Sequence, residues 1–64
     1  MNKPADGDRV IVVLVDDKEH HGTVDWVGAA QFAVELDDGW PRQLILFTEA
    51  WRFERQHQKS GGSQ

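Results

Sequence analysis

The chain contains no cysteine and no tyrosine. Without cysteine it can form neither a disulfide framework nor a thiolate zinc site, which are the two commonest ways of stabilising a very small protein. A single domain of 64 residues hides only about 60% of the surface that its unfolded chain exposes. We therefore expect self-association to supply part of its stability.

Long hydrophobic runs are absent as well. Residues 1–6 hold no apolar run of signal-peptide length, and no later segment reaches the length of a membrane span. We therefore expect a cytoplasmic protein that does not insert into a membrane.

Catalytic and metal-binding groups are also sparse. Serine occurs only at Ser60 and Ser63, which argues against a serine hydrolase. His20 and His21 stand beside acidic residues, but adjacent histidines in an extended segment point to opposite sides, which disfavours a closed metal site. We therefore predict a solvated loop over residues 16–21, no catalytic residue, no metal and no cofactor.

Acidic residues are concentrated in the first two thirds of the chain. Residues 5–40 carry nine acidic and two basic side chains, whereas residues 41–64 carry two acidic and four basic ones, within a net charge of −4. An acidic surface repels phosphate, so binding to DNA or RNA is disfavoured. The carboxylates either keep the loops soluble or form an acidic face that mimics nucleic acid or docks on a basic partner.

A two-residue hydrophobic alternation over residues 22–36 predicts a β-hairpin. Val24 and Trp26 fall on one face of its first strand, and Phe32, Val34 and Leu36 on one face of its second, with residues 28–30 as the link. The polar residues between them should face water. These are Thr23, Asp25, Gln31 and Glu35.

Two flanking strands, residues 9–15 and 43–47, are apolar on both sides. Core positions on the first strand should be Val10, Val12 and Leu14. The apolar side chains on the opposite face of each strand then need another partner to cover them. If the remaining side chains are contiguous, they form an exposed patch large enough to mark an interface. These residues are Ile11, Val13, Val15, Ile45 and Phe47. The alternative is that barrel curvature brings some of them into the core.

Turn signals separate the strands. The Asp37-Asp38-Gly39 run has the composition of a tight turn that needs positive φ, and Pro41 then marks the entry to the strand at residues 43–47. Residues 48–50 are predicted to form a single 3₁₀ turn before a fifth strand at 51–54. The alternative is a helix from Thr48 to about Lys59.

Five short strands with turn signals every 8 to 12 residues are typical of a small, partly open barrel. We predict an all-β fold, a five-stranded SH3-like barrel over residues 7–55, between a flexible N-terminus (1–6) and a disordered tail (56–64). Residues 7–10 with 22–24 resemble the opening of a KOW module, and residues 22–37 resemble part of a CAP-Gly domain. The peptide-binding stretch of the CAP-Gly family is replaced here by residues 37–41, so its ligand is not carried over.

The chain also resembles the plasmid-encoded type II dihydrofolate reductases, which are small SH3-like barrels that assemble as homotetramers around a central pore. Residues 7–10, Gly22, Trp26 and residues 32–35 lie at similar spacing. The family's Val-Gln-Ile-Tyr pore motif corresponds to residues 42–46, which keep a glutamine followed by aliphatic residues but have no tyrosine. The resemblance implies a shared architecture, with an NADPH-dependent reductase as an alternative function.

Trp40 is the leading candidate for a binding residue. It follows a turn and precedes Pro41, where no core residue is required, and exposed tryptophan is enriched in binding hot spots. With neighbouring aromatic side chains it would form a pocket at the barrel mouth. The binding residues proposed on this basis are Trp40, Trp26, Phe32, Trp51, Asp37 and Asp38. The alternative is that Trp26 and Phe32 only fill the core.

Two classes of function follow. The first is a non-catalytic, self-associating interaction module that binds another protein through an aromatic and acidic surface; an inhibitor or accessory protein of a mobile genetic element is one setting for it. The second is the pore-type reductase, with NADPH bound at residues 43–46.

Overall fold

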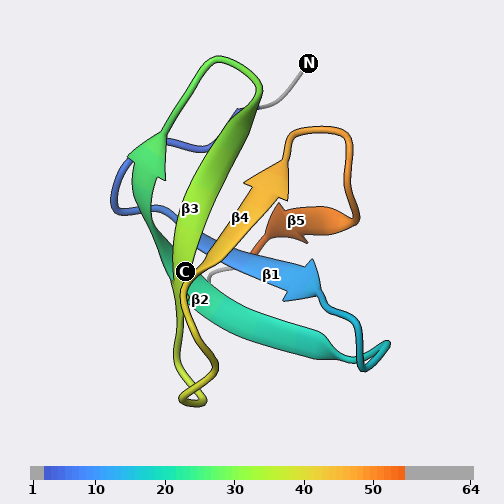
Figure 1. The fold of residues 1–64 in the computed structure, drawn as a ribbon. Coiled ribbons are helices and arrows are strands. Elements are labelled where there is room, and N and C mark those ends of the chain that lie inside the picture. The colour runs from blue at the N-terminus through green and yellow to red at the C-terminus, as the bar shows by residue number, and fades with distance from the viewer. Residues whose placement is uncertain (1–2, 55–64) are drawn as a thin grey trace, which may run out of the picture.

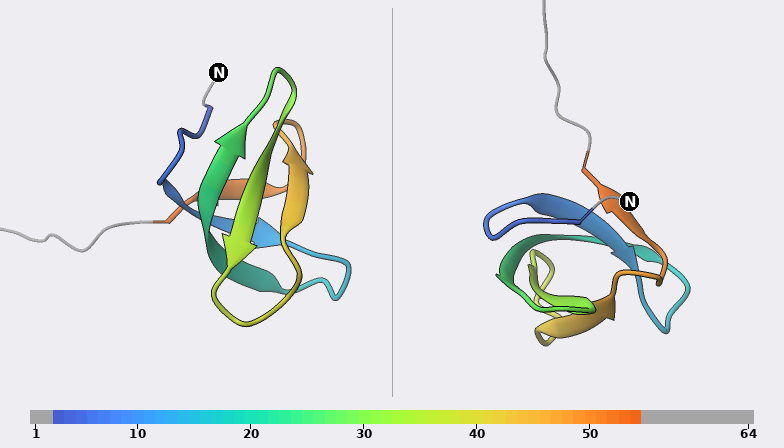
Figure 2. Two further views of the ribbon diagram at one scale, coloured as in Figure 1. Left: turned by 60° about the vertical axis from the view of Figure 1, so that its left-hand side comes forward. Right: turned by 90° about the horizontal axis from the view of Figure 1, so that it is seen from above.

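A computed structural model describes residues 3–54, which form five antiparallel strands and no helix. The strands are β1 (Arg9–Val13), β2 (Glu19–Val27), β3 (Gln31–Leu36), β4 (Gln43–Leu46) and β5 (Trp51–Phe53). They form one sheet in the order β4-β3-β2-β1-β5. The sheet curls into a half-barrel whose two edges, β4 and β5, are not paired (Figures 1 and 2). The all-β prediction is confirmed.

Two segments differ from the sequence-based expectation. His20 and His21 belong to β2 rather than to a loop, because β2 extends back to Glu19 to pair with β1. The alternative helix is wrong over residues 48–54, where a turn is followed by β5. Residues 1–2 and the predicted tail at 56–64 lie outside the described residues.

The strand β2 pairs with β1 through its first half and with β3 through its second half. Gly22 belongs to both pairings, opposite Val10 on one side and Leu36 on the other. A Cβ atom at Gly22 would lie 2.6 Å from the Glu35 carbonyl oxygen and 2.7 Å from a Val34 methyl group. Only a residue without a side chain therefore allows β2 and β3 to approach so closely at this bend.

A β-bulge in β2 changes which residues face the core. The register between β2 and β3 shifts between Val24 and Trp26, so that Asp25 is the extra residue. Val24 is fully buried and Val27 packs against the core, whereas Trp26 is 45% exposed. The expectation that Val24 and Trp26 share one face is therefore wrong, because a bulge reverses the alternation after it.

Phe32 lies at the centre of the core. Its ring meets Trp51 edge-on with centroids 5.1 Å apart and stacks on Phe47 at 6.2 Å. The Trp51 indole N–H donates to the Phe47 carbonyl oxygen at 3.0 Å, which ties the β4–β5 turn to β5. The other buried members of this core are Val10, Val12, Val24, Val34, Leu36 and Ile45.

The predicted interface of five residues is not one contiguous face. Ile45 is buried and Phe47 packs against the core, because Ile45 lies opposite the buried Phe32 and directly opposed residues share a face of the sheet. Leu44 and Leu46 point outward in their place. Ile11 is buried as well, and only Val13 and Val15 are exposed.

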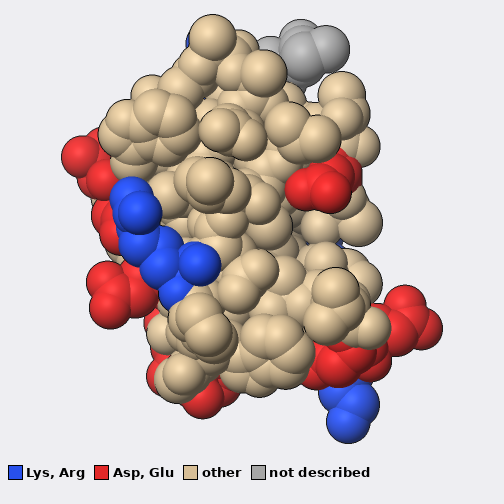
Figure 3. Space-filling view, viewed as in Figure 1, with Lys and Arg blue, Asp and Glu red and all other residues tan. Residues whose placement is uncertain are grey.

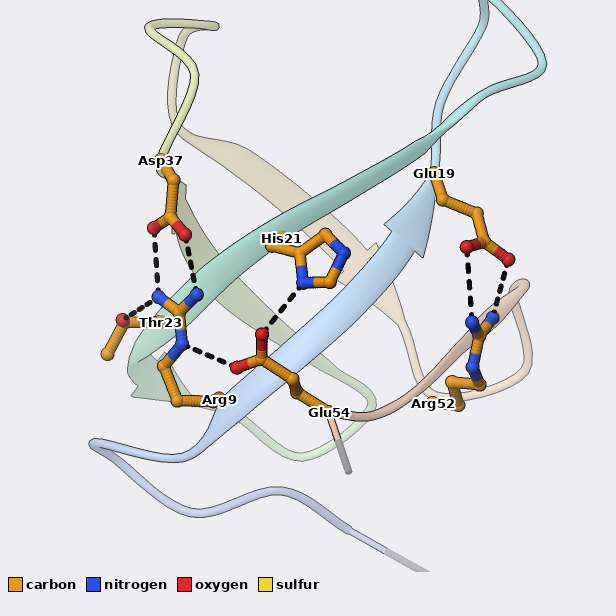
Figure 4. A network of polar contacts seen from close by, with 7 residues as sticks. All are labelled: Arg9, Glu19, His21, Thr23, Asp37, Arg52 and Glu54. Carbon is orange, nitrogen blue, oxygen red and sulfur yellow. Dashed lines mark hydrogen bonds and ion pairs between the residues drawn. The ribbon is translucent and has the colours of Figure 1, made fainter. Parts of the chain in front are cut away.

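A polar network lies on the outer face of β1 (Figure 4), the face to which the buried Ile11 belongs. Its cross-strand neighbours are His21 on β2 and Arg52 on β5. Ion pairs and hydrogen bonds then link residues along and across these strands: Arg9–Glu54 at 2.8 Å, His21–Glu54 at 2.8 Å, Arg52–Glu19 at 2.7 Å and Arg9–Asp37. Long polar side chains thus bury an outward-facing isoleucine.

We predict that Gly22→Ala lowers the free energy of unfolding by about 1–3 kcal/mol, the usual cost of overpacking, because backbone of β3 would have to move. Urea unfolding followed by circular dichroism measures this change. Gly28→Ala is the matched control, since the three atoms nearest to its Cβ all belong to the partly exposed ring of Trp26, which can move more easily than backbone. Equal losses in the two variants would contradict the close approach at Gly22.

Candidate functional site

A groove of about 390 Å³ lies at the open side of the half-barrel. Residues 13–15 at the end of β1 form one wall and residues 43–45 of β4 form the other. Trp40, Glu49 and Ala50 complete the lining. Most of these side chains are apolar, and Val15 is 96% exposed.

The strand β4 turns part of its backbone toward this groove. The Phe47 N–H donates to the Ala30 carbonyl oxygen at 3.0 Å, which fixes the phase of the β3–β4 ladder. Backbone groups alternate in direction along an antiparallel strand. Those of Ile45 therefore face β3, whereas those of Leu44 and Leu46 face away from it.

Glu49 forms hydrogen bonds with both outward-facing backbone groups of Leu46. Its carboxylate accepts from the Leu46 N–H at 3.0 Å, and its own N–H donates to the Leu46 carbonyl oxygen at 2.9 Å. Within residues 3–54 no hydrogen bond joins the outward side of Leu44 to the rest of the chain. The free edge of β4 is thus reduced to Leu44, which lines the groove.

Trp40 lies at one end of the groove, half-buried rather than exposed as expected. Its ring packs against the core and tilts against the ring of His20, with centroids 4.8 Å apart at 57°. Trp40 therefore both supports the core and offers part of its ring to the groove.

His20 joins two turns beneath Trp40. Its Nδ1 lies 2.5 Å from Asp38 in the β3–β4 turn, and its Nε2 lies 2.9 Å from Asp16 in the β1–β2 turn. The ring is only 6% exposed. Because both ring nitrogens contact carboxylates, the imidazolium form, which donates from both, fits this position.

The charges around His20 stabilise one another. The Asp38 carboxylate, with Asp16, raises the pKa of His20 despite its burial. Burial opposes the shift at Asp16, but the Lys18 N–H and the His20 ring lower the pKa of that carboxyl group. The His20 ring lowers the pKa of Asp38. The prediction of a solvated loop at this histidine is therefore wrong.

The proposed aromatic pocket is not assembled, because its members are distributed over different parts of the molecule. Trp26 lies on the outer face, Phe32 is fully buried and Trp51 packs on Phe32. Asp37 pairs with Arg9, outside the groove. Asp38 alone is brought close to Trp40, through His20 and through a hydrogen bond of 3.4 Å from the Trp40 N–H.

Side chains of β2 and β4 form an exposed apolar area, the outer patch, which consists of Trp26, Leu44 and Leu46. Ala33 on β3 lies between them, opposite Trp26 on one side and Leu44 on the other, and is fully buried. Leu44 is 57% and Leu46 is 44% exposed. Figure 3, viewed from the β4 side, shows a broad uncharged area bordered by acidic and basic side chains.

Metal-binding clusters were sought among residues 3–54, and none holds three or more suitable histidine or carboxylate side chains. The same residues include no helix that is long and apolar enough to cross a membrane. Comparison with protein-family models, curated proteins and solved structures found no match to the chain.

Sequence reasoning missed His20 and Glu49. A signal for His20 was present, since carboxylates stand four residues before it and in the turn that follows β3, but only the hairpin geometry brings both to one ring. Glu49 had no signal, because its function depends on the free edge of β4.

We predict that stability is greatest between about pH 4 and 6.5, the range between ordinary aspartate and histidine pKa values. Because the pKa of His20 is raised in the folded state, its full contribution to stability is present below its unfolded-state pKa. This contribution is lost as the pH rises through its folded-state pKa. The lowered pKa values of Asp16 and Asp38 make their contributions fall away as acid protonates them in the folded state.

Urea unfolding as a function of pH tests this expectation, and His20→Gln should flatten the decline above about pH 6.5. Ala29→Ser, on the surface, controls for a general effect of substitution. Titration of the His20 ring by NMR gives a second measurement in the unaltered protein. A ring that titrates at or below the ordinary histidine pKa would contradict the prediction.

Proposed function

We propose that the protein is a non-catalytic SH3-like interaction module that associates with itself through the outer patch. The observation that carries this proposal is that Trp26, Leu44 and Leu46 stay about half exposed although the core is already filled by other residues. Exposed apolar side chains that gather on one face of a sheet mark an interaction surface.

A second copy of the chain fits the charges beside the patch. Arg42 and Asp25 lie next to it and pair with each other at 3.1 Å, so both signs of charge are present. A two-fold contact brings the same surface of each copy together and therefore needs a self-complementary surface. In such a contact Arg42 of one copy can exchange its partner for Asp25 of the other.

The size of the patch sets the strength of the contact. Contiguous apolar patches of a few hundred Å² are common on monomers, whereas stable complexes bury about 800 Å² on each partner. Three half-exposed side chains and their polar surroundings offer less area than the surface that each partner buries in a stable complex. We therefore infer a weak, concentration-dependent dimer.

We predict that sedimentation equilibrium over a wide concentration range detects reversible self-association, and that Leu46→Ser weakens it at least about tenfold. The reason is the loss of about 1.5–3 kcal/mol for each large apolar side chain buried, counted on both copies. Val13→Ser is the matched control, since Val13 is similarly exposed at 37% but lies outside the patch. A strictly monomeric protein would contradict the proposal.

The reductase alternative receives less support from the geometry of β4. The Gln43 side chain donates to the Pro41 carbonyl oxygen at 2.8 Å, and Arg42 is paired with Asp25. A nucleotide cofactor with several phosphates requires cations beside its binding strand.

We predict that NADPH does not bind saturably at millimolar concentration, because Arg42, which directly precedes β4, is already paired with Asp25, and Lys3 lies over the Phe47 ring. The intrinsic fluorescence of the reduced nucleotide reports binding directly. Saturable binding, abolished by substitution of Gln43, would favour the reductase instead of the interaction module.

A further inference from the structure

The groove differs from the outer patch in one important respect, because it combines apolar side chains with free backbone. Leu44 presents an N–H and a carbonyl oxygen toward it, and Glu49 closes the edge beyond, at Leu46. An edge strand with unpaired backbone groups is a template for one more strand. A groove beside such an edge supplies the space for that strand's side chains.

We propose that the groove binds an extended segment of a partner protein, which adds to β4 as a further strand and carries basic side chains between its apolar ones. The apolar side chains of this segment enter between residues 13–15 and β4, against Trp40. Its backbone pairs with Leu44, and its basic side chains reach the rim.

The basic character of the partner follows from the charges at the rim. Glu49 is the one charged residue in the lining. Asp16 and Asp17 directly follow Val15, so the wall formed by residues 13–15 ends in two carboxylates, of which Asp16 is paired with His20 and Asp17 is exposed. Lys18 is the nearest cation along this segment besides the buried His20. A basic segment is therefore attracted, and an acidic one is repelled.

Two other occupants fit less well. Residues 55–64 of the chain are basic but contain no aliphatic or aromatic side chain, so they have nothing to place among the apolar walls. A second copy would have to pair β4 with β4, which brings both Glu49 carboxylates to the same seam, and the chain as a whole carries a net charge of −4. A basic, apolar segment of another protein lacks both disadvantages.

The test uses the full chain and a capped peptide of about eight residues in which lysine alternates with valine. ¹⁵N NMR is expected to show shifts at Val13, Leu14, Val15 and Leu44, with Trp26 unaffected. A peptide in which glutamate replaces lysine should bind much more weakly. N-methylation of the central backbone amide should weaken binding by about fivefold, since it removes the hydrogen bond to the Leu44 carbonyl oxygen, worth about 1 kcal/mol.

Two variants locate the site. Glu49→Gln keeps the acceptor for the Leu46 N–H but removes the charge, and is expected to weaken the lysine peptide about two- to fivefold, as for an exposed ion pair. Val15→Ser removes an exposed apolar wall without disturbing the core. Equal binding of the two peptides, or insensitivity to N-methylation, would overturn the proposal. So would shifts confined to Trp26 and Leu46 of the outer patch.

The outcome is separable from that of the self-association experiment. The groove and the outer patch share Leu44, but Val15 belongs to the groove alone and Leu46 to the outer patch alone, so Val15→Ser and Leu46→Ser alter them separately. Sedimentation of the Val15→Ser variant should remain that of the unaltered protein while its peptide binding is reduced. A monomeric protein that still binds the lysine peptide would leave the groove proposal standing and remove the proposed dimer.

Discussion

The strand β2 has to pair with two partners across a sharp bend, and the rest of the structure depends on how it does so. Gly22 permits the bend because it has no side chain to meet β3. The bulge at Asp25 then shifts the alternation by one residue. As a result Val27 takes the place on the inner face and Trp26 turns outward. One extra residue in one strand thus creates part of the outer patch.

A half-barrel of five short strands has a small interior, and this chain deals with its surplus apolar residues in two ways. On β1, Ile11 is covered by the ion-paired network of Arg9, Glu54 and their neighbours. On β4, Leu44 and Leu46 remain uncovered. Ion pairs at a surface contribute little stability by themselves, but their long side chains exclude water from the isoleucine below. No such cover exists over the β4 leucines within the described residues.

The groove has a fixed end and an open middle. His20 holds the β1–β2 and β3–β4 turns together, and Trp40 packs on its ring. The end of the groove is therefore fixed by a charged cluster, while its middle, at Leu44 and Val15, is open. A rigid end beside a free strand edge is well suited to accept an extended segment, because little ordering of the site itself is needed on binding.

The sequence alone determined the all-β class, the five strands and the Asp-Gly turn, whose Gly39 has the expected positive φ of 90°. These features depend on local periodicity and turn chemistry. It could not determine which side of β4 faces inward, since Leu44, Ile45 and Leu46 are equally apolar and only pairing with Phe32 decides. Nor could it place Trp26 or His20. Their surroundings arise from a bulge and from two distant turns, which exist only once the strands have paired.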